Sequence, residues 1–74
     1  MKLYKSETGK TAIQVRADSI SFYGSVYRFF EGSWYGVGTT RDVDHENSDQ
    51  VFQTMADKID NVIFDLTDCD CIIT

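Results

Sequence analysis

The sequence predicts a small α+β domain, in which an antiparallel sheet of about four strands carries one amphipathic helix on one face. Three observations lead to this prediction. Residues 11–18 alternate between apolar and polar side chains, which is typical of a half-buried strand. Residues 25–40 hold two β-prone runs with a turn at Gly32 between them. Residues 51–66 repeat apolar side chains at the spacing of a helix face.

The first hairpin is expected to join residues 3–5 to residues 11–18. The turn between them contains Gly9, which can adopt a positive φ without steric cost. Ile13 and Val15 point to one face of the return strand and polar side chains point to the other. The pattern therefore predicts one buried and one open face.

The second hairpin is expected at residues 20–30 and 34–40, with a bend permitted at Gly24. Gly36 and Gly38 stand two positions apart in the return strand, so they share a face. They indicate a bulge, a large aromatic side chain packed across the strand, or a site of close approach.

One helix is expected from about residue 48 to about residue 60. Asn47 or Ser48 would cap it, and Asp49 lies in the first turn, where the helix dipole favours a negative charge. Its apolar face comprises Val51, Phe52, Met55, Ala56 and Ile59. Residues 61–74 are expected to add extended or strand structure.

The chain of 74 residues is expected to form one domain, spanning residues 1–74. So small a core leaves little room for a catalytic pocket, so an enzyme is not expected. The polar start of the chain has no apolar signal region, and no stretch is long and apolar enough to span a membrane. We therefore expect a cytoplasmic protein without a membrane partner, located in the host cytoplasm if it is phage-encoded.

The candidate chemical motifs are incomplete. Residues 42–49 place oxygens at the spacing of an EF-hand, but Asn47 and Gln53 stand where that loop needs glycine and a bidentate glutamate. His45 has no nucleophile motif to complete a triad. The two thiols of Cys69-Asp70-Cys71 are too few for a structural zinc site. No catalytic residue, metal or cofactor is therefore expected.

The charge is divided between the two halves of the chain. Residues 1–40 carry five basic and three acidic side chains, a net of +2, whereas residues 41–74 carry two basic and nine acidic ones, a net of −7. Six carboxylates are expected to form one acidic surface at the entry and outward face of the helix: Asp42, Asp44, Glu46, Asp49, Asp57 and Asp60. Such a surface would attract a protein with a basic, nucleic-acid-binding groove. No direct nucleic-acid binding is expected at a net charge of −5, because phosphate would be repelled.

Eight of the ten aromatic side chains lie in residues 1–40. Tyr27 and Phe29 face opposite to Arg28 on the same strand, and one helix covers only one face of a sheet, so one set is expected to stay exposed. Exposed aromatic side chains are typical of protein interfaces, although they can also stack on single-stranded bases. The expected partner-binding residues of this hairpin are Tyr27, Phe29, Trp34 and Tyr35.

The chain resembles the small phage-encoded inhibitor proteins, anti-CRISPR proteins among them. It shares with them a compact pair of antiparallel hairpins, the lack of a catalytic motif, and an acidic entry at Arg41–Asp44 into an amphipathic helix at Val51–Ile59. The hairpins bear Lys2, Lys5, Lys10, Arg16 and Arg28. The resemblance covers size, charge and element order and carries no specific motif. It implies a protein that mimics nucleic acid electrostatically and blocks a CRISPR surveillance complex.

The leading hypothesis is a non-enzymatic binding or inhibitor protein that acts through its acidic face on a nucleic-acid-binding protein, such as a CRISPR effector. The alternative is a structural or assembly module that forms a homodimer, or docks on a larger complex, through its aromatic hairpin. A third hypothesis is a metal-binding module that uses the two cysteines and the acidic loop.

Overall fold

The computed structural model describes the whole chain except residues 1, 18–20, 41–42, 45–47 and 73–74, and it describes residues 44, 70 and 72 by their backbone alone. The strands are β1 (Lys2–Lys5), β2 (Thr11–Ala17), β3 (Ser21–Phe30), β4 (Ser33–Thr39), β5 (Val43–Asp44) and β6 (Asp70–Ile72). The α-helix α1 spans Ser48–Ile59, and a single 3₁₀ turn, η1, spans Leu66–Asp68. The expected cap at Asn47 lies outside the described residues.

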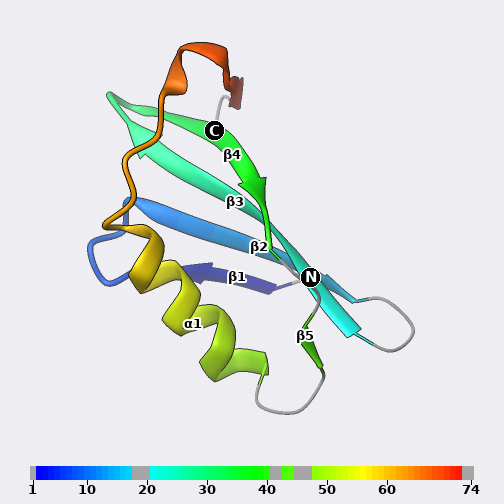
Figure 1. Cartoon of the computed structure of the whole chain (residues 1–74). Helices are drawn as coiled ribbons and strands as arrows, with labels where there is room; N and C mark the ends of the chain where they lie inside the picture. The colour runs from blue at the N-terminus through cyan, green and yellow to red at the C-terminus, as the bar shows by residue number, and fades with distance from the viewer. Residues whose placement is uncertain (1, 18–20, 41–42, 45–47, 73–74) are drawn as a thin grey trace.

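One antiparallel sheet contains all six strands, in the order β1-β2-β3-β4-β6 (Figure 1). The short strand β5 pairs with the start of β3, on the far side of β3 from β2. The predicted α+β fold, with four main antiparallel strands and one helix, is confirmed. The structure adds the two short strands β5 and β6.

The second hairpin contains the bulge and the packed aromatic ring that its glycines predicted, but Gly36 and Gly38 do not share a face: they pair with Tyr27 and Val26, which point to opposite faces of the sheet. The pairing of β3 with β4 shifts register between Val26 and Tyr27, so that Val37 is an extra residue between Gly36 and Gly38. This is a β-bulge, which twists a strand locally. The Tyr27 ring also packs across Gly36, with its Cε1 3.8 Å from the position that a Cβ would occupy.

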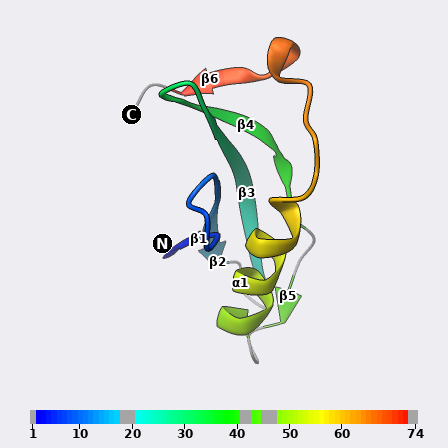
Figure 2. The ribbon, with the colours of Figure 1, turned by 90° about the vertical axis from the view of Figure 1, so that its left-hand side faces the viewer.

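The helix packs against one face of the sheet, over β1 and β2 (Figure 2). Phe52 and Ala56 of α1 are fully buried, and the Tyr4 ring stacks on Phe52 with centroids 5.7 Å apart. The buried apolar cluster comprises Ile13, Val15, Val26, Phe52 and Ala56. The side chains of β2 and β3 that alternate with these point to the opposite face of the sheet, which no helix of the described residues covers.

The helix ends where the sequence predicted, and the chain then crosses the sheet. Two tight backbone hydrogen bonds, from Asn61 N to Lys58 O and from Val62 N to Ile59 O, close the last turn. The β-branched run that follows forms no strand, and Ile63 is 96% exposed. Asp65 caps η1 by accepting from the backbone N–H and the hydroxyl of Thr67, and these bonds lower the pKa of its carboxyl.

Candidate binding surface

The acids of the helix lie in one line that faces the first hairpin. Asp49, Gln53 and Asp57 are spaced at i, i+4 and i+8, so they share one helix face. Gln53 Nε2 donates to Lys5 O at 2.8 Å, and Glu7 N donates to Asp57 Oδ1 at 2.9 Å. We name Asp49, Gln53, Asp57 and Asp60 the polar stripe.

The sequence predicts Asp57 and Asp60 on the outward face of the helix. Asp57 is exposed, whereas Asp60 is half-buried against the first hairpin. Their carboxylates accept hydrogen bonds from the turn of the first hairpin and from Thr11 at the start of β2. The strand β1 has an unpaired edge with free backbone groups, and the polar stripe satisfies some of them. The helical pattern of the sequence shows only that these side chains are polar. A polar side chain can face another element as readily as it faces water.

Asp49 lies at the first turn of α1, where it accepts from Tyr4 OH and, at 3.1 Å, from Lys2 Nζ. The bond from Tyr4, then the bond and charge of Lys2, lower the pKa of Asp49. Burial and the same bond raise the pKa of the Tyr4 hydroxyl. The Asp49 side chain is 70% exposed, so this ion pair organises the helix start more than it stabilises the fold.

Asp60 follows the last helical residue and holds the turn of the first hairpin. It accepts from Thr8 Oγ1 at 2.7 Å and from Thr11 Oγ1, whose residue is fully buried. Burial alone would raise the pKa of Asp60, but hydrogen bonds from Thr11, Thr8 and Ser6, together with the charge of Lys10, lower it. Asp60 therefore stays ionised at neutral pH and serves a structural contact.

The rest of the predicted acidic surface lies outside the described side chains. Asp42 and Glu46 are outside the described residues, and Asp44 is placed only by its backbone, which pairs with Ser21. Among the side chains that the structure describes, Asp49, Asp57 and Asp60 are thus the predicted acids that lie together.

The aromatic side chains of the second hairpin divide between the two faces of the sheet. Phe29 pairs with Trp34, and their rings lie 5.1 Å apart at 57°. Tyr27 lies one position along the same face, which is the face opposite the helix. Phe29 is 41% exposed, and Tyr27 and Trp34 are half-buried. We name this uncovered side of the sheet the open face.

The open face also contains cationic side chains that the sequence had not marked as a site. Lys5 Nζ lies 5.8 Å from the centroid of the Trp34 ring, a cation–π contact that reaches across the sheet from β1. Arg16, exposed on β2, pairs in register with Tyr23 of β3. Leu3, 57% exposed, shares this face. Strand alternation could have placed these side chains on the open face, because their strand neighbours are the core residues that point to the helix.

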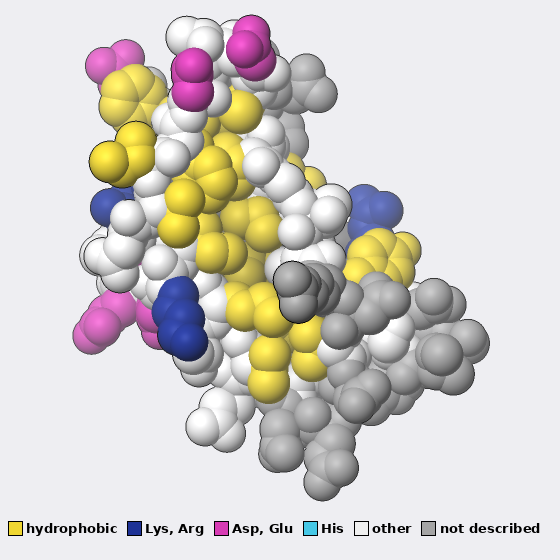
Figure 3. Space-filling view, in the orientation of Figure 1, with side chains coloured by type: hydrophobic (Ala, Val, Ile, Leu, Met, Phe, Trp, Pro, Cys, Tyr) yellow, Lys and Arg dark blue, Asp and Glu magenta, His cyan; other side chains and the backbone are white. Residues whose placement is uncertain are grey.

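Tyr35 lies on the other side, so it does not join the other three predicted aromatics. It pairs with Arg28, which faces the helix. Figure 3 shows hydrophobic side chains gathered in a strip on this helix-side face. A groove of about 630 Å³ opens here, lined among others by Phe30, Tyr35, Phe64 and Leu66.

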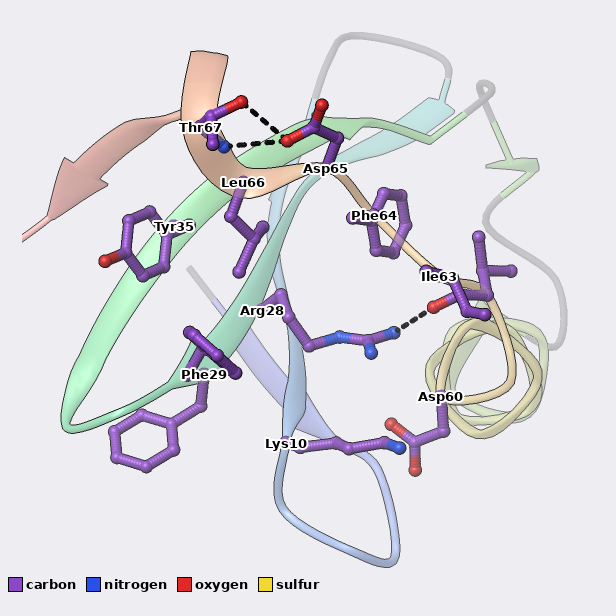
Figure 4. Close-up of a pocket in the computed structure, with 12 residues that line it drawn as sticks. Lys10, Arg28, Phe29, Tyr35, Asp60, Ile63, Phe64, Asp65, Leu66 and Thr67 are labelled. Carbon is purple, nitrogen blue, oxygen red and sulfur yellow. Dashed lines mark hydrogen bonds between the residues drawn. The ribbon is translucent and has the colours of Figure 1, made fainter.

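Arg28 secures the segment that walls this groove (Figure 4). Its guanidinium donates to the carbonyls of Ile59 and Val62 and lies 5.0 Å from the centroid of the Phe64 ring. Carbonyls at a helix C-terminus carry partial negative charge and favour a cation. The sequence did not indicate this contact, because Arg28 and the helix end stand more than thirty residues apart in the chain.

Within the described residues, no cluster of three or more His, Cys, Asp or Glu side chains could hold a metal ion. Cys69 and Cys71 are both free thiols. His45 and most of the acidic loop lie outside the described residues. No helix in the described ranges is both long and apolar enough to cross a membrane.

The chain matches no protein-family model, no curated protein and no solved structure. Its function is therefore inferred from its own residues and geometry.

Proposed function

We propose that this protein is a non-enzymatic binding module that docks on a partner protein through its open face. The observation that carries the proposal is the group of Tyr27, Phe29 and Trp34 on the side of the sheet that no described element covers. Phe29 is exposed, and the exposed side chain of Leu3 extends the same surface.

This surface has the composition of an interaction site. Aromatic side chains dominate the energetic centres of protein interfaces, and polar groups surround them. Here Gln14 of β2 contacts Tyr27, and Arg16 of β2 lies on the same face in register with Tyr23. The molecule measures 35 × 22 × 19 Å. Its broad side is thus close to the roughly 800 Å² that each partner contributes to a standard interface.

Selection of peptides against the folded protein tests the proposal. A random dodecapeptide library is selected on the immobilised protein, and the enriched peptides are titrated while the emission of Trp34, the single tryptophan, is recorded. We expect the emission to change on binding. We expect Phe29→Ala to weaken binding by about tenfold or more, as truncation of an interface anchor does.

The matched control is Lys58→Ala, which alters an exposed side chain of α1 on the other side of the sheet. It is expected to leave affinity unchanged. Peptides that bind Phe29→Ala as tightly as the natural protein, without altering Trp34 emission, would refute the proposal.

A second candidate function uses the polar stripe. Asp49, Asp57 and Asp60 lie on one side of the molecule, and the lowered pKa values of Asp49 and Asp60 favour their charged forms. A basic groove of a nucleic-acid-binding protein would be attracted to such a line of carboxylates. The role as an inhibitor of a CRISPR complex belongs to this candidate and stays a prediction.

The two candidates predict different salt and mutation responses. Binding through the polar stripe should weaken steeply with salt and be lost in Asp57→Asn, whereas Phe29→Ala should not affect it. Binding through the apolar open face should show the reverse pattern. Because the stripe and the open face lie on different sides of the sheet, single substitutions separate them.

A further inference from the structure

We infer that the partner of the open face is a protein surface with carboxylates around an apolar centre. This inference rests on the proposed function, since it names the chemistry of the partner at the same site. It is carried by the position of two cations on that face: Lys5 at the Trp34 ring, and Arg16 in register with Tyr23.

Lys5 lies within the aromatic group. Its ammonium is 5.8 Å from the Trp34 centroid, and Trp34 in turn contacts Phe29. A partner side chain that packs on these rings would therefore meet a positive charge at the same place. A partner with a carboxylate next to an apolar group fits this place. The carboxylate pairs with the Lys5 ammonium, and the apolar group covers the aromatic rings.

Neither cation of the open face has a carboxylate partner among the described residues. The ion pair found in the described part of the chain joins Lys2 to Asp49, on the helix side. The strand residues whose side chains are described on the open face include Lys5 and Arg16 and no acid. Both cations are exposed, so they are available to a partner.

Three of the described acids are held on the other side of the sheet. Asp57 and Asp60 are bound to the turn of the first hairpin, and Asp49 is bound to Lys2 and Tyr4. The charged side chains described on the open face are thus both basic, although the whole chain carries a net charge of −5 and Asp70, placed by its backbone alone, pairs with Gly36 at a register position of this face. Complementary potential steers association and disfavours partners with the wrong charge.

A second copy of the chain fits this face less well. In a twofold dimer the same patch meets itself, so it must supply both members of every charge pair. The described side chains of the open face supply cations alone. Single-stranded nucleic acid also fits less well, because two cations could neutralise about two phosphates while the remaining charge of the chain repels the rest.

The test uses the peptides selected as above, now read for composition and for their response to charge reversal. We expect the enriched peptides that perturb Trp34 to contain Asp or Glu beside an aromatic or aliphatic residue. We expect Lys5→Glu and Arg16→Glu each to weaken their binding by about tenfold, as the loss and reversal of a charge pair does. Lys58→Glu makes the same charge change on the helix and should leave binding within about twofold.

The outcomes separate the inference from the proposed function. Peptides that perturb Trp34 and fail on Phe29→Ala, but are neutral or basic, overturn the inference and leave the docking face standing. Peptides that ignore Phe29→Ala overturn both. Thermal unfolding of each variant shows that it is folded, and Arg16→Ala is a milder substitute if either reversal prevents folding.

Two further experiments test whether the open face binds single-stranded nucleic acid or a second copy of the chain. A single-stranded deoxythymidine dodecamer is titrated against Trp34 emission, and sedimentation velocity measures self-association. Quenching by the oligonucleotide at a concentration comparable to that of the peptides, lost in Lys5→Glu, overturns the inference in favour of nucleic acid. A dimer that dissociates in Phe29→Ala overturns it in favour of a second copy.

Discussion

Removal of the Asp60 carboxylate should destabilise the protein by leaving a buried hydroxyl without its partner. Asp60 accepts from Thr11 Oγ1, and Thr11 has no exposed surface. A buried polar group left unsatisfied costs about 1–3 kcal/mol. Thr8, the other donor, is exposed and can bond to water instead. We therefore expect Asp60→Ala to lose about 1–3 kcal/mol of the roughly 4–11 kcal/mol typical of a domain this size.

Urea denaturation, followed by Trp34 fluorescence, measures this loss. The double variant T11V/D60A removes both partners of the bond, so it should be more stable than D60A alone. Asp68→Ala, at an exposed acid of η1, serves as the control and should change stability by less than about 0.5 kcal/mol. The reasoning fails if D60A is neutral, or if T11V/D60A is no more stable than D60A.

The same contact predicts how stability depends on pH. The folded pKa of Asp60 lies below its ordinary value of 3.8, so its contribution is present above that value and is lost as pH falls through the folded pKa. Asp49 and Asp65 shift in the same direction. The difference in unfolding free energy between the natural protein and Asp60→Asn should therefore shrink below about pH 4. A difference that stays constant down to pH 2 would contradict the role of the ionised carboxylate.

Three further predictions concern the packing around the sheet. Gly24→Ala places a methyl group 2.5 Å from Ile13 Cγ2 and should cost about 1–3 kcal/mol in thermal unfolding, whereas Gly38→Ala, with open space at that position, should not. Arg28→Ala removes the contact of Arg28 with the helix end, so amide hydrogen exchange should speed up at Asn61 and Val62, whose N–H groups close the helix end, and stay unchanged in β2. Replacement of the Asp49 charge by Asn should lower the pKa of the Tyr4 hydroxyl towards its ordinary value, followed by NMR of labelled tyrosine, and an unchanged pKa would show that burial alone raises it.

Much of the fold could be predicted from local pattern. The alternation along residues 11–18 identified β2, and the helical spacing of Phe52 and Ala56 identified α1 to within a residue or two. Gly36 and Gly38 marked the bulge and the aromatic packing of the return strand. Periods of 2 and 3.6 residues are local properties of the sequence, so they identify strands and helices without knowledge of the element that packs against them.

The candidate site was less predictable, because it depends on which elements face each other. The sequence grouped Tyr35 with Trp34, but adjacent strand residues point to opposite faces. It also grouped the acids of the helix with the aromatic hairpin as one partner-binding set, whereas the sheet lies between them.

The division of charge along the chain is a property of the sequence itself: a mildly basic first half and an acidic second half. What the tertiary structure decided is where these charges point. Long-range contacts between Asp60 and Thr11, and between Gln53 and Lys5, hold the polar stripe against the first hairpin. Such contacts join residues almost fifty positions apart, so no local pattern encodes them. The same packing leaves Lys5 and Arg16 beside the exposed rings, on the face where we propose that a partner binds.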